Sequence, residues 1–153
     1  MRDNLISHLK DHHATADTAN FNVLDFVSAF GSPLEALAYS YLFWPDFIEF
    51  EGMIFHESVI ENEDDRSRIR AALIELRIAE EVEKSFNQFL IPNDLFSSGL
   101  STTSDVENVF LAERLADAWR ARLTVLFRNK KCVVEVQSEE ENNEGPTIIV
   151  YQG

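Results

Sequence analysis

The residues best suited to chemistry gather around His56, which stands next to Glu57 and close in sequence to Glu49 and Glu51. A histidine with neighbouring carboxylates can act as a general acid–base pair or contribute to a metal-dependent hydrolase. The sequence shows no nucleophile, oxyanion-hole or Gly-rich phosphate-loop motif to accompany it. We therefore favour a surface histidine with acidic neighbours, predict no catalytic residue, and keep a small hydrolase that uses His56 as the alternative.

A second group of possible metal ligands lies near the start of the chain. His8 and His12 are four residues apart, as are His13 and Asp17, so a helix would bring each pair together. The segment is weakly helical in pattern and lacks the spacing of a known metal motif. Nor is there an Asp-x-Asp-x-Asp-Gly calcium loop. We predict exposed histidines, with no metal or other cofactor.

Charge is the most unusual property of this sequence. Residues 11–65 contain twelve carboxylates and no Lys or Arg, so they carry −12 of the formal net charge of −14. Such a field repels nucleic acid and anionic lipid, and it steers a basic protein partner. Eight of these carboxylates follow Trp44 within residues 44–65. The predicted partner-binding residues are Trp44, Asp46, Glu49, Glu51, Glu57, Glu61, Glu63, Asp64 and Asp65.

A solubilising surface explains the same charge without any partner. Aromatic residues interleave the carboxylates, however, as anchors do within a charged interface rim. In a binding mechanism the carboxylates of residues 46–65 would raise the association rate, and aromatics near Trp44 would slow dissociation. A DNA mimic is a third, weaker alternative.

The helices and strands expected from the sequence, which would position these residues, indicate an α+β fold. The chain length of 153 residues suits one domain, and we expect residues 1–20 to be loosely ordered. Apolar periodicity predicts about four helices, at 20–30, 33–43, 65–90 and 104–128. Strands are expected at 47–55, 131–137 and 147–152, forming a small antiparallel sheet of about three strands. Gly52 allows a short hairpin in place of the first strand.

Two helix starts are marked by capping boxes, Ser32 with Glu35 and Ser104 with Glu107. The strands at 131–137 and 147–152 carry apolar residues on both faces, which predicts either a second covering layer or a face that binds another chain, including a homodimer partner. Cys132 is the only cysteine, and its apolar neighbours predict a buried thiol. Without a signal peptide or an apolar run long enough for a bilayer, we expect a cytoplasmic protein.

The run 37–52, Leu-Ala-Tyr-Ser-Tyr-Leu-Phe-Trp-Pro-Asp-Phe-Ile-Glu-Phe-Glu-Gly, resembles a segment of small bacterial proteins of unassigned function. The C-terminal half is similar to theirs in residues 118–121, 133–136 and 150–152. In size and acidity the chain also resembles bacterial immunity proteins, which neutralise a toxin by binding it. This second resemblance implies an acidic interaction module, an inhibitor of a basic toxin or nuclease.

Overall fold

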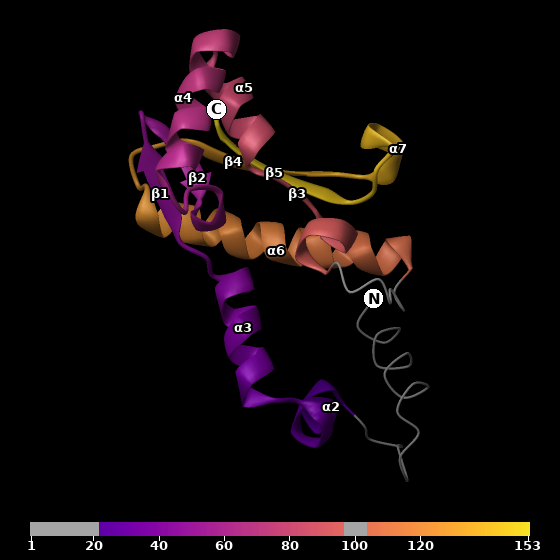
Figure 1. Ribbon diagram of the computed structural model, residues 1–153. Coiled ribbons are helices and arrows are strands. Elements are labelled where there is room, and N and C mark those ends of the chain that lie inside the picture. The colour runs from indigo at the N-terminus through magenta and orange to yellow at the C-terminus, as the bar shows by residue number, and fades with distance from the viewer. Residues whose placement is uncertain (1–21, 97–103) are drawn as a thin grey trace. The chain divides into compact units, whose positions relative to one another are not determined.

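The computed structural model describes residues 22–96 and 104–153, and their helices and antiparallel strands confirm the predicted α+β class (Figure 1). By its internal contacts the chain divides into two units, Met1–Ser40 and Tyr41–Gly153. The predicted loose segment 1–20, with His8, His12 and His13, lies outside the described residues. Within the described ranges, no helix is both long and apolar enough to cross a membrane.

The first unit contains α2 (Val23–Phe30) and most of α3 (Pro33–Phe43), which confirms the two helices predicted there. Asn22 caps α2: its Oδ1 accepts the N–H of Leu24 at 2.8 Å, and the Asp25 carboxylate accepts the N–H of Asn22 at 3.0 Å. Ser32 begins α3 by accepting the N–H of Glu35. Neither helix contains a buried residue.

The second unit begins with the hairpin of β1 (Phe47–Phe50) and β2 (Met53–His56). Glu51 and Gly52 form its turn with φ angles of 52° and 79°. Positive φ at both central residues is typical of a type I′ turn, which matches the twist of the flanking strands. A continuous strand over 47–55 is therefore wrong, and the short hairpin that Gly52 allowed is confirmed.

A single helix over 65–90 is also wrong. The segment forms α4 (Glu63–Leu76), α5 (Ala79–Phe86) and the short strand β3 (Gln88–Leu90). Arg77 ends α4 in the left-handed region at φ 59°, and Ile78 is extended. The backbone therefore turns between the helices although apolar residues keep their helical spacing across the break. After β3 come the single π turn η2 (Ile91–Leu95) and the long helix α6 (Asp105–Leu126), which Ser104 and Glu107 cap as predicted.

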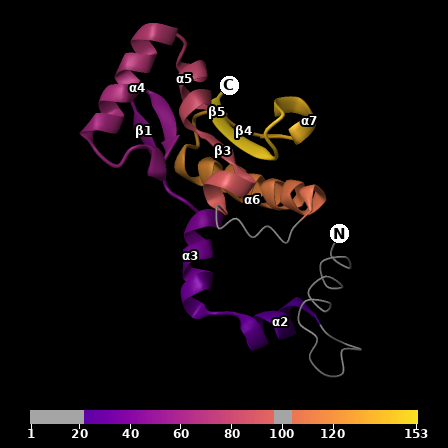
Figure 2. The same ribbon diagram turned by 45° about the vertical axis from the view of Figure 1, so that its right-hand side comes forward.

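The main sheet has the strand order β3-β5-β4, with β4 (Cys132–Gln137) and β5 (Thr147–Gln152) where strands were predicted. A one-turn helix, α7 (Glu139–Asn142), lies in the connection between them. Helix α6 packs on β4 and β5, and α5 contacts β5 and β2 from the other side (Figures 1 and 2). Thr147–Val150 are buried in succession. The two apolar faces of β5 are thus explained by a second covering layer.

Two buried polar side chains, Glu83 of α5 and Asn87 directly after this helix, join the hairpin to the main sheet. Glu83 accepts the N–H of Ile54 in β2 at 2.6 Å and the N–H of Gln152 in β5 at 2.8 Å. Asn87 donates to the carbonyls of Ile54 and Val150, at 2.8 and 3.1 Å. These side chains supply the hydrogen bonds that direct strand pairing would have supplied, so polar groups between β2 and β5 are satisfied.

Candidate functional site

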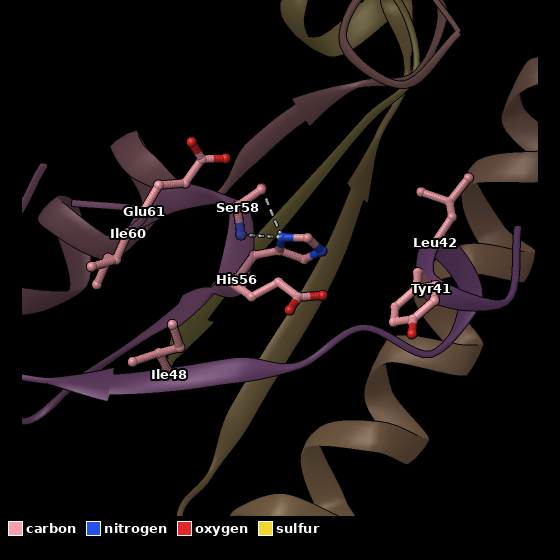
Figure 3. A pocket seen from close by; sticks show the side chains of 8 residues that line it. Tyr41, Leu42, Ile48, His56, Ser58, Ile60 and Glu61 are labelled. Atoms are coloured by element: carbon pink, nitrogen blue, oxygen red, sulfur yellow. Dashed lines mark hydrogen bonds between the residues drawn. The ribbon is translucent and has the colours of Figure 1, made fainter. Parts of the chain in front are cut away.

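A hollow of about 640 Å³ opens beside the end of β2 in the second unit (Figure 3). Its walls come from the last turn of α3, from β1, and from the chain that follows β2 through the 3₁₀ turn η1 (Glu57–Val59). It combines one histidine and two carboxylates with apolar side chains. The lining residues are Tyr41, Leu42, Ile48, His56, Glu57, Ser58, Ile60 and Glu61.

His56 lines this hollow and is held in place by backbone and ring contacts. Its backbone N–H donates to Oδ1 of Asn87 at 2.9 Å. Its ring packs against three aromatic rings, with centroid distances of 5.5 Å to Phe47, 5.0 Å to Phe89 and 5.2 Å to Trp119. The indole N–H of Trp119 in turn donates to the carbonyl of Leu42 at 2.8 Å, which anchors the α3 side of the hollow.

The contacts of the His56 ring fix its tautomer. Nδ1 accepts the backbone N–H of Ser58 at 3.2 Å and lies 2.8 Å from the Ser58 hydroxyl (Figure 3). A backbone N–H can only donate, so Nδ1 carries no proton and the proton of the neutral ring is on Nε2. Nε2 makes no hydrogen bond with the described residues. His56 therefore offers one N–H donor to the hollow.

Burial lowers the pKa of His56 from its ordinary 6.5 to about 4. The ring is consequently neutral at pH 7, and its one basic nitrogen is already occupied by Ser58. Glu49 and Glu51, predicted neighbours of His56 in an acid–base pair, bind elsewhere: Glu49 with Lys130 at 2.9 Å and Glu51 with Arg70 at 3.1 Å. The structure does not bring these two carboxylates to the histidine.

Other predicted partner-binding residues are engaged within the chain. Arg122 pairs with Asp46 and lies over the Trp44 ring at 5.6 Å. Arg70 pairs with Glu63 at 3.0 Å, as well as with Glu51. Oδ2 of Asp65 accepts the N–H groups of Glu61 and Asn62, at 3.1 and 3.2 Å, as a cap of α4. Through these contacts the carboxylates stabilise the fold, and the negative charge that these carboxylates present to solvent is lower.

Three of the predicted carboxylates, Glu57, Glu61 and Asp64, form no ion pair with the residues that the structure describes. Glu57 and Glu61 both line the hollow, and Asp64 follows in the first turn of α4. Of the predicted carboxylates, fewer are therefore available to a partner, and two of these three line the hollow.

The hollow also contains residues that sequence reasoning missed: Tyr41, Leu42, Ile48, Ser58 and Ile60. Tyr41, Leu42, Ile48 and Ile60 looked like ordinary apolar positions of a helix, a strand and a loop. The spacing of His56 and Ser58 could have predicted their contact. In a local turn, a side chain can accept a hydrogen bond from the backbone N–H two residues later.

His, Cys, Asp and Glu side chains in 22–96 and 104–153 do not gather in threes that could hold a metal ion. Comparisons of the chain with protein-family models, with curated proteins and with solved structures found no match. The resemblance of residues 37–52 to a bacterial segment, and that of the whole chain to immunity proteins, stay predictions. Function has to be argued from the geometry of the hollow.

Proposed function

We propose that this chain is an acidic protein–protein interaction module that binds a basic protein, as an immunity-type inhibitor binds a basic toxin or nuclease. The observation that carries the proposal is the place of the carboxylates without an internal ion pair. Glu57 and Glu61 flank a hollow with apolar walls, and Asp64 lies next to them in sequence. Charge beside desolvated apolar surface is the arrangement found in interface hot spots and their rims.

In this mechanism the two kinds of residue have separate effects. The formal net charge of −14 attracts a basic partner over a distance and repels nucleic acid and anionic membranes. Close to the surface, Glu57, Glu61 and Asp64 orient that partner and raise the association rate. Tyr41, with an exposed fraction of 70%, and the apolar walls of the hollow then slow dissociation.

The test is a triple variant, Glu57→Gln, Glu61→Gln and Asp64→Asn, compared with the unaltered protein. A partner is first captured from a lysate of the source organism, identified and purified. Its association with each variant is then followed by stopped flow at several salt concentrations. We expect the triple variant to associate about tenfold more slowly at low salt, with a weaker dependence on salt.

The matched control is Glu75→Gln, Glu140→Gln and Glu144→Gln, which removes the same charge from exposed positions outside the hollow. It should change the association rate far less. Equal losses in both triple variants would mean that only net charge matters and would contradict a binding surface at the hollow. A captured partner that is not basic would contradict the proposal as a whole.

The alternative, a metal-dependent hydrolase that uses His56, stays a prediction. It needs a basic histidine close to several carboxylates. The neutral ring of His56, its bond to Ser58 and the pairing of Glu49 and Glu51 with cations give it no comparable support.

A further inference from the structure

We propose that the hollow beside His56 binds one arginine residue of the basic partner, taking its guanidinium and its main-chain carbonyl together. This inference rests on the proposed function, since it assigns the contact by which the partner would be held. It follows from the hydrogen-bonding groups of the hollow, which include both a fixed donor and a charged acceptor. A ligand that satisfies them has to bring a cation and an acceptor at once.

The donor is the Nε2–H of His56. Because Ser58 occupies Nδ1, the ring cannot turn over without losing that bond, and Phe47, Phe89 and Trp119 hold its plane. A guanidinium has only donors, so it cannot satisfy Nε2–H. The carbonyl oxygen of the same arginine residue can, and every peptide residue carries one. Burial lowers the pKa of the ring, so at pH 7 it adds no positive charge that would repel the cation.

The acceptor is the carboxylate of Glu57, which follows His56 in the chain and lines the hollow, whereas the Glu61 carboxylate points away from the His56 ring (Figure 3). Glu57 is half-buried and accepts the backbone N–H of Asp46 through one oxygen at 3.4 Å, which limits its movement. Glu61 is exposed, and its own N–H is held by Asp65. Arginine suits a carboxylate of limited movement better than lysine does, because its planar guanidinium presents N–H groups in a fixed fork that can pair with both carboxylate oxygens.

The walls and the size of the hollow suit the rest of the side chain. Leu42, Ile48 and Ile60 line it, so the methylene stem would meet apolar side chains. Arginine places its stem along such surfaces while its charged end stays near water. The volume of about 640 Å³ falls in the range of about 300–1,000 Å³ usual for small-molecule sites.

The probe for this inference is N-acetyl-L-arginine amide, titrated into the full-length protein labelled with ¹⁵N histidine. We expect weak, millimolar binding that shifts the Nε2 resonance of His56. Two ligands serve as controls. N-acetyl-L-citrulline amide keeps the shape and the carbonyl but has no charge, and it should bind at least fivefold more weakly. Propylguanidine keeps the cation but has no carbonyl, so it should leave the Nε2 resonance of His56 almost unchanged.

Two protein variants complete the design. Glu57→Gln with Glu61→Gln should weaken binding of the arginine amide at least fivefold, whereas Glu140→Gln with Glu144→Gln should leave it within twofold. Equal binding of the arginine and citrulline amides, or no response of His56, would overturn the assignment. The titration needs no protein partner. If the arginine amide binds as expected but the lysate contains no basic partner, only the proposed function is contradicted. If a basic partner is captured but the arginine amide does not bind, only the arginine site is contradicted.

Discussion

His56 is best understood as a core aromatic residue with one polar edge at the surface. Its ring contacts Phe47, Phe89 and Trp119, and burial holds its pKa at about 4, below the ordinary 6.5. The unfolded chain therefore binds a proton at higher pH than the folded chain does. This difference makes folding stability depend on pH in a predictable direction.

Above pH 6.5 the residue is neutral in both states and contributes no pH dependence. As the pH falls from 6.5 to 4, only the unfolded state takes up the proton, so the folded state loses up to about 3 kcal/mol of stability from this residue. Below pH 4 the loss is complete. His56→Phe keeps an aromatic ring that does not titrate, so its free energy of unfolding should fall less over this interval.

Urea unfolding of both proteins at pH 7.5, 5.5 and 4.5 measures the effect. Both proteins contain the same carboxylates, so the difference between the two pH profiles isolates His56. Parallel profiles would contradict a buried neutral histidine. This holds even if the profiles differ by a constant offset, because such an offset reports only the lost bond to Ser58 and altered packing.

The sequence singled out His56 but was wrong about its surroundings: a surface histidine was favoured, whereas the ring packs against Phe47, Phe89 and Trp119. Proximity along the chain suggested Glu49, Glu51 and Glu57 as its partners, yet only Glu57 lines the hollow. Glu49 and Glu51 instead meet Lys130 and Arg70, which lie far along the chain and in different elements. Cations that fold back from distant segments cannot be located from spacing within the acidic segment.

At the scale of elements, α5 is the part that holds the two sheets together. Its Glu83 is fully buried, and its carboxylate accepts two backbone N–H groups and the side-chain amide of Gln152 at 2.8 Å. No Lys or Arg of the described residues pairs with it. An amide in its place would present an N–H₂ group to donors, so some of these bonds would be lost.

Glu83→Gln should therefore lower the free energy of unfolding by about 2 kcal/mol, the cost of hydrogen bonds to a buried charged group. The measurement is urea unfolding at pH 7.5. Glu81→Gln is the matched control, because Glu81 lies on the same helix, is exposed, and makes only a 3.7 Å ion pair with Lys84. Its cost should stay below about 0.5 kcal/mol. Equal costs would show that Glu83 does not bridge the sheets.

The helices and strands themselves were mostly predictable, because caps and apolar periodicity are local. Ser104 with Glu107 begins α6, and the strands near Val134 and Val150 lie where they were expected. The break at Arg77 was not predictable. Arginine is a good helix former, and its left-handed conformation separates two helices whose Ile69 and Val82 share one core cluster with residues of the hairpin. Tertiary packing overrode a continuous helical pattern.

For the whole molecule, the segregation of charge in the sequence is partly undone by folding. Basic residues of α4 and α6, together with Lys130, reach the acidic segment and pair with Asp46, Glu49, Glu51 and Glu63. Such surface pairs contribute little stability each. Within residues 46–65 they leave only Glu57, Glu61 and Asp64 without an ion pair to the described residues, which narrows the part of this acidic segment that the proposed basic partner would recognise.

The two units should also differ in local stability. Helix α2 contains no buried residue, whereas α6 contributes Leu115, Ala116 and Trp119 to the core, each with an exposed fraction of 0%. Opening α2 therefore exposes little new apolar surface, and opening α6 requires loss of the core. In hydrogen exchange at pH 7 we expect peptides from 23–30 to exchange at least a hundredfold faster than peptides from 112–123.

Mass spectrometry of exchanged peptides makes this comparison directly, with peptides of β5 as an internal standard for the core. Helices as apolar as α2, which carries only one charged residue, Asp25, are normally buried. Strong protection of 23–30 would therefore contradict the prediction and would show that another surface covers the helix. Repeating the exchange at a tenfold lower protein concentration then shows whether the covering surface belongs to a second copy of the chain. Protection by a second copy weakens on dilution, whereas protection within one chain does not.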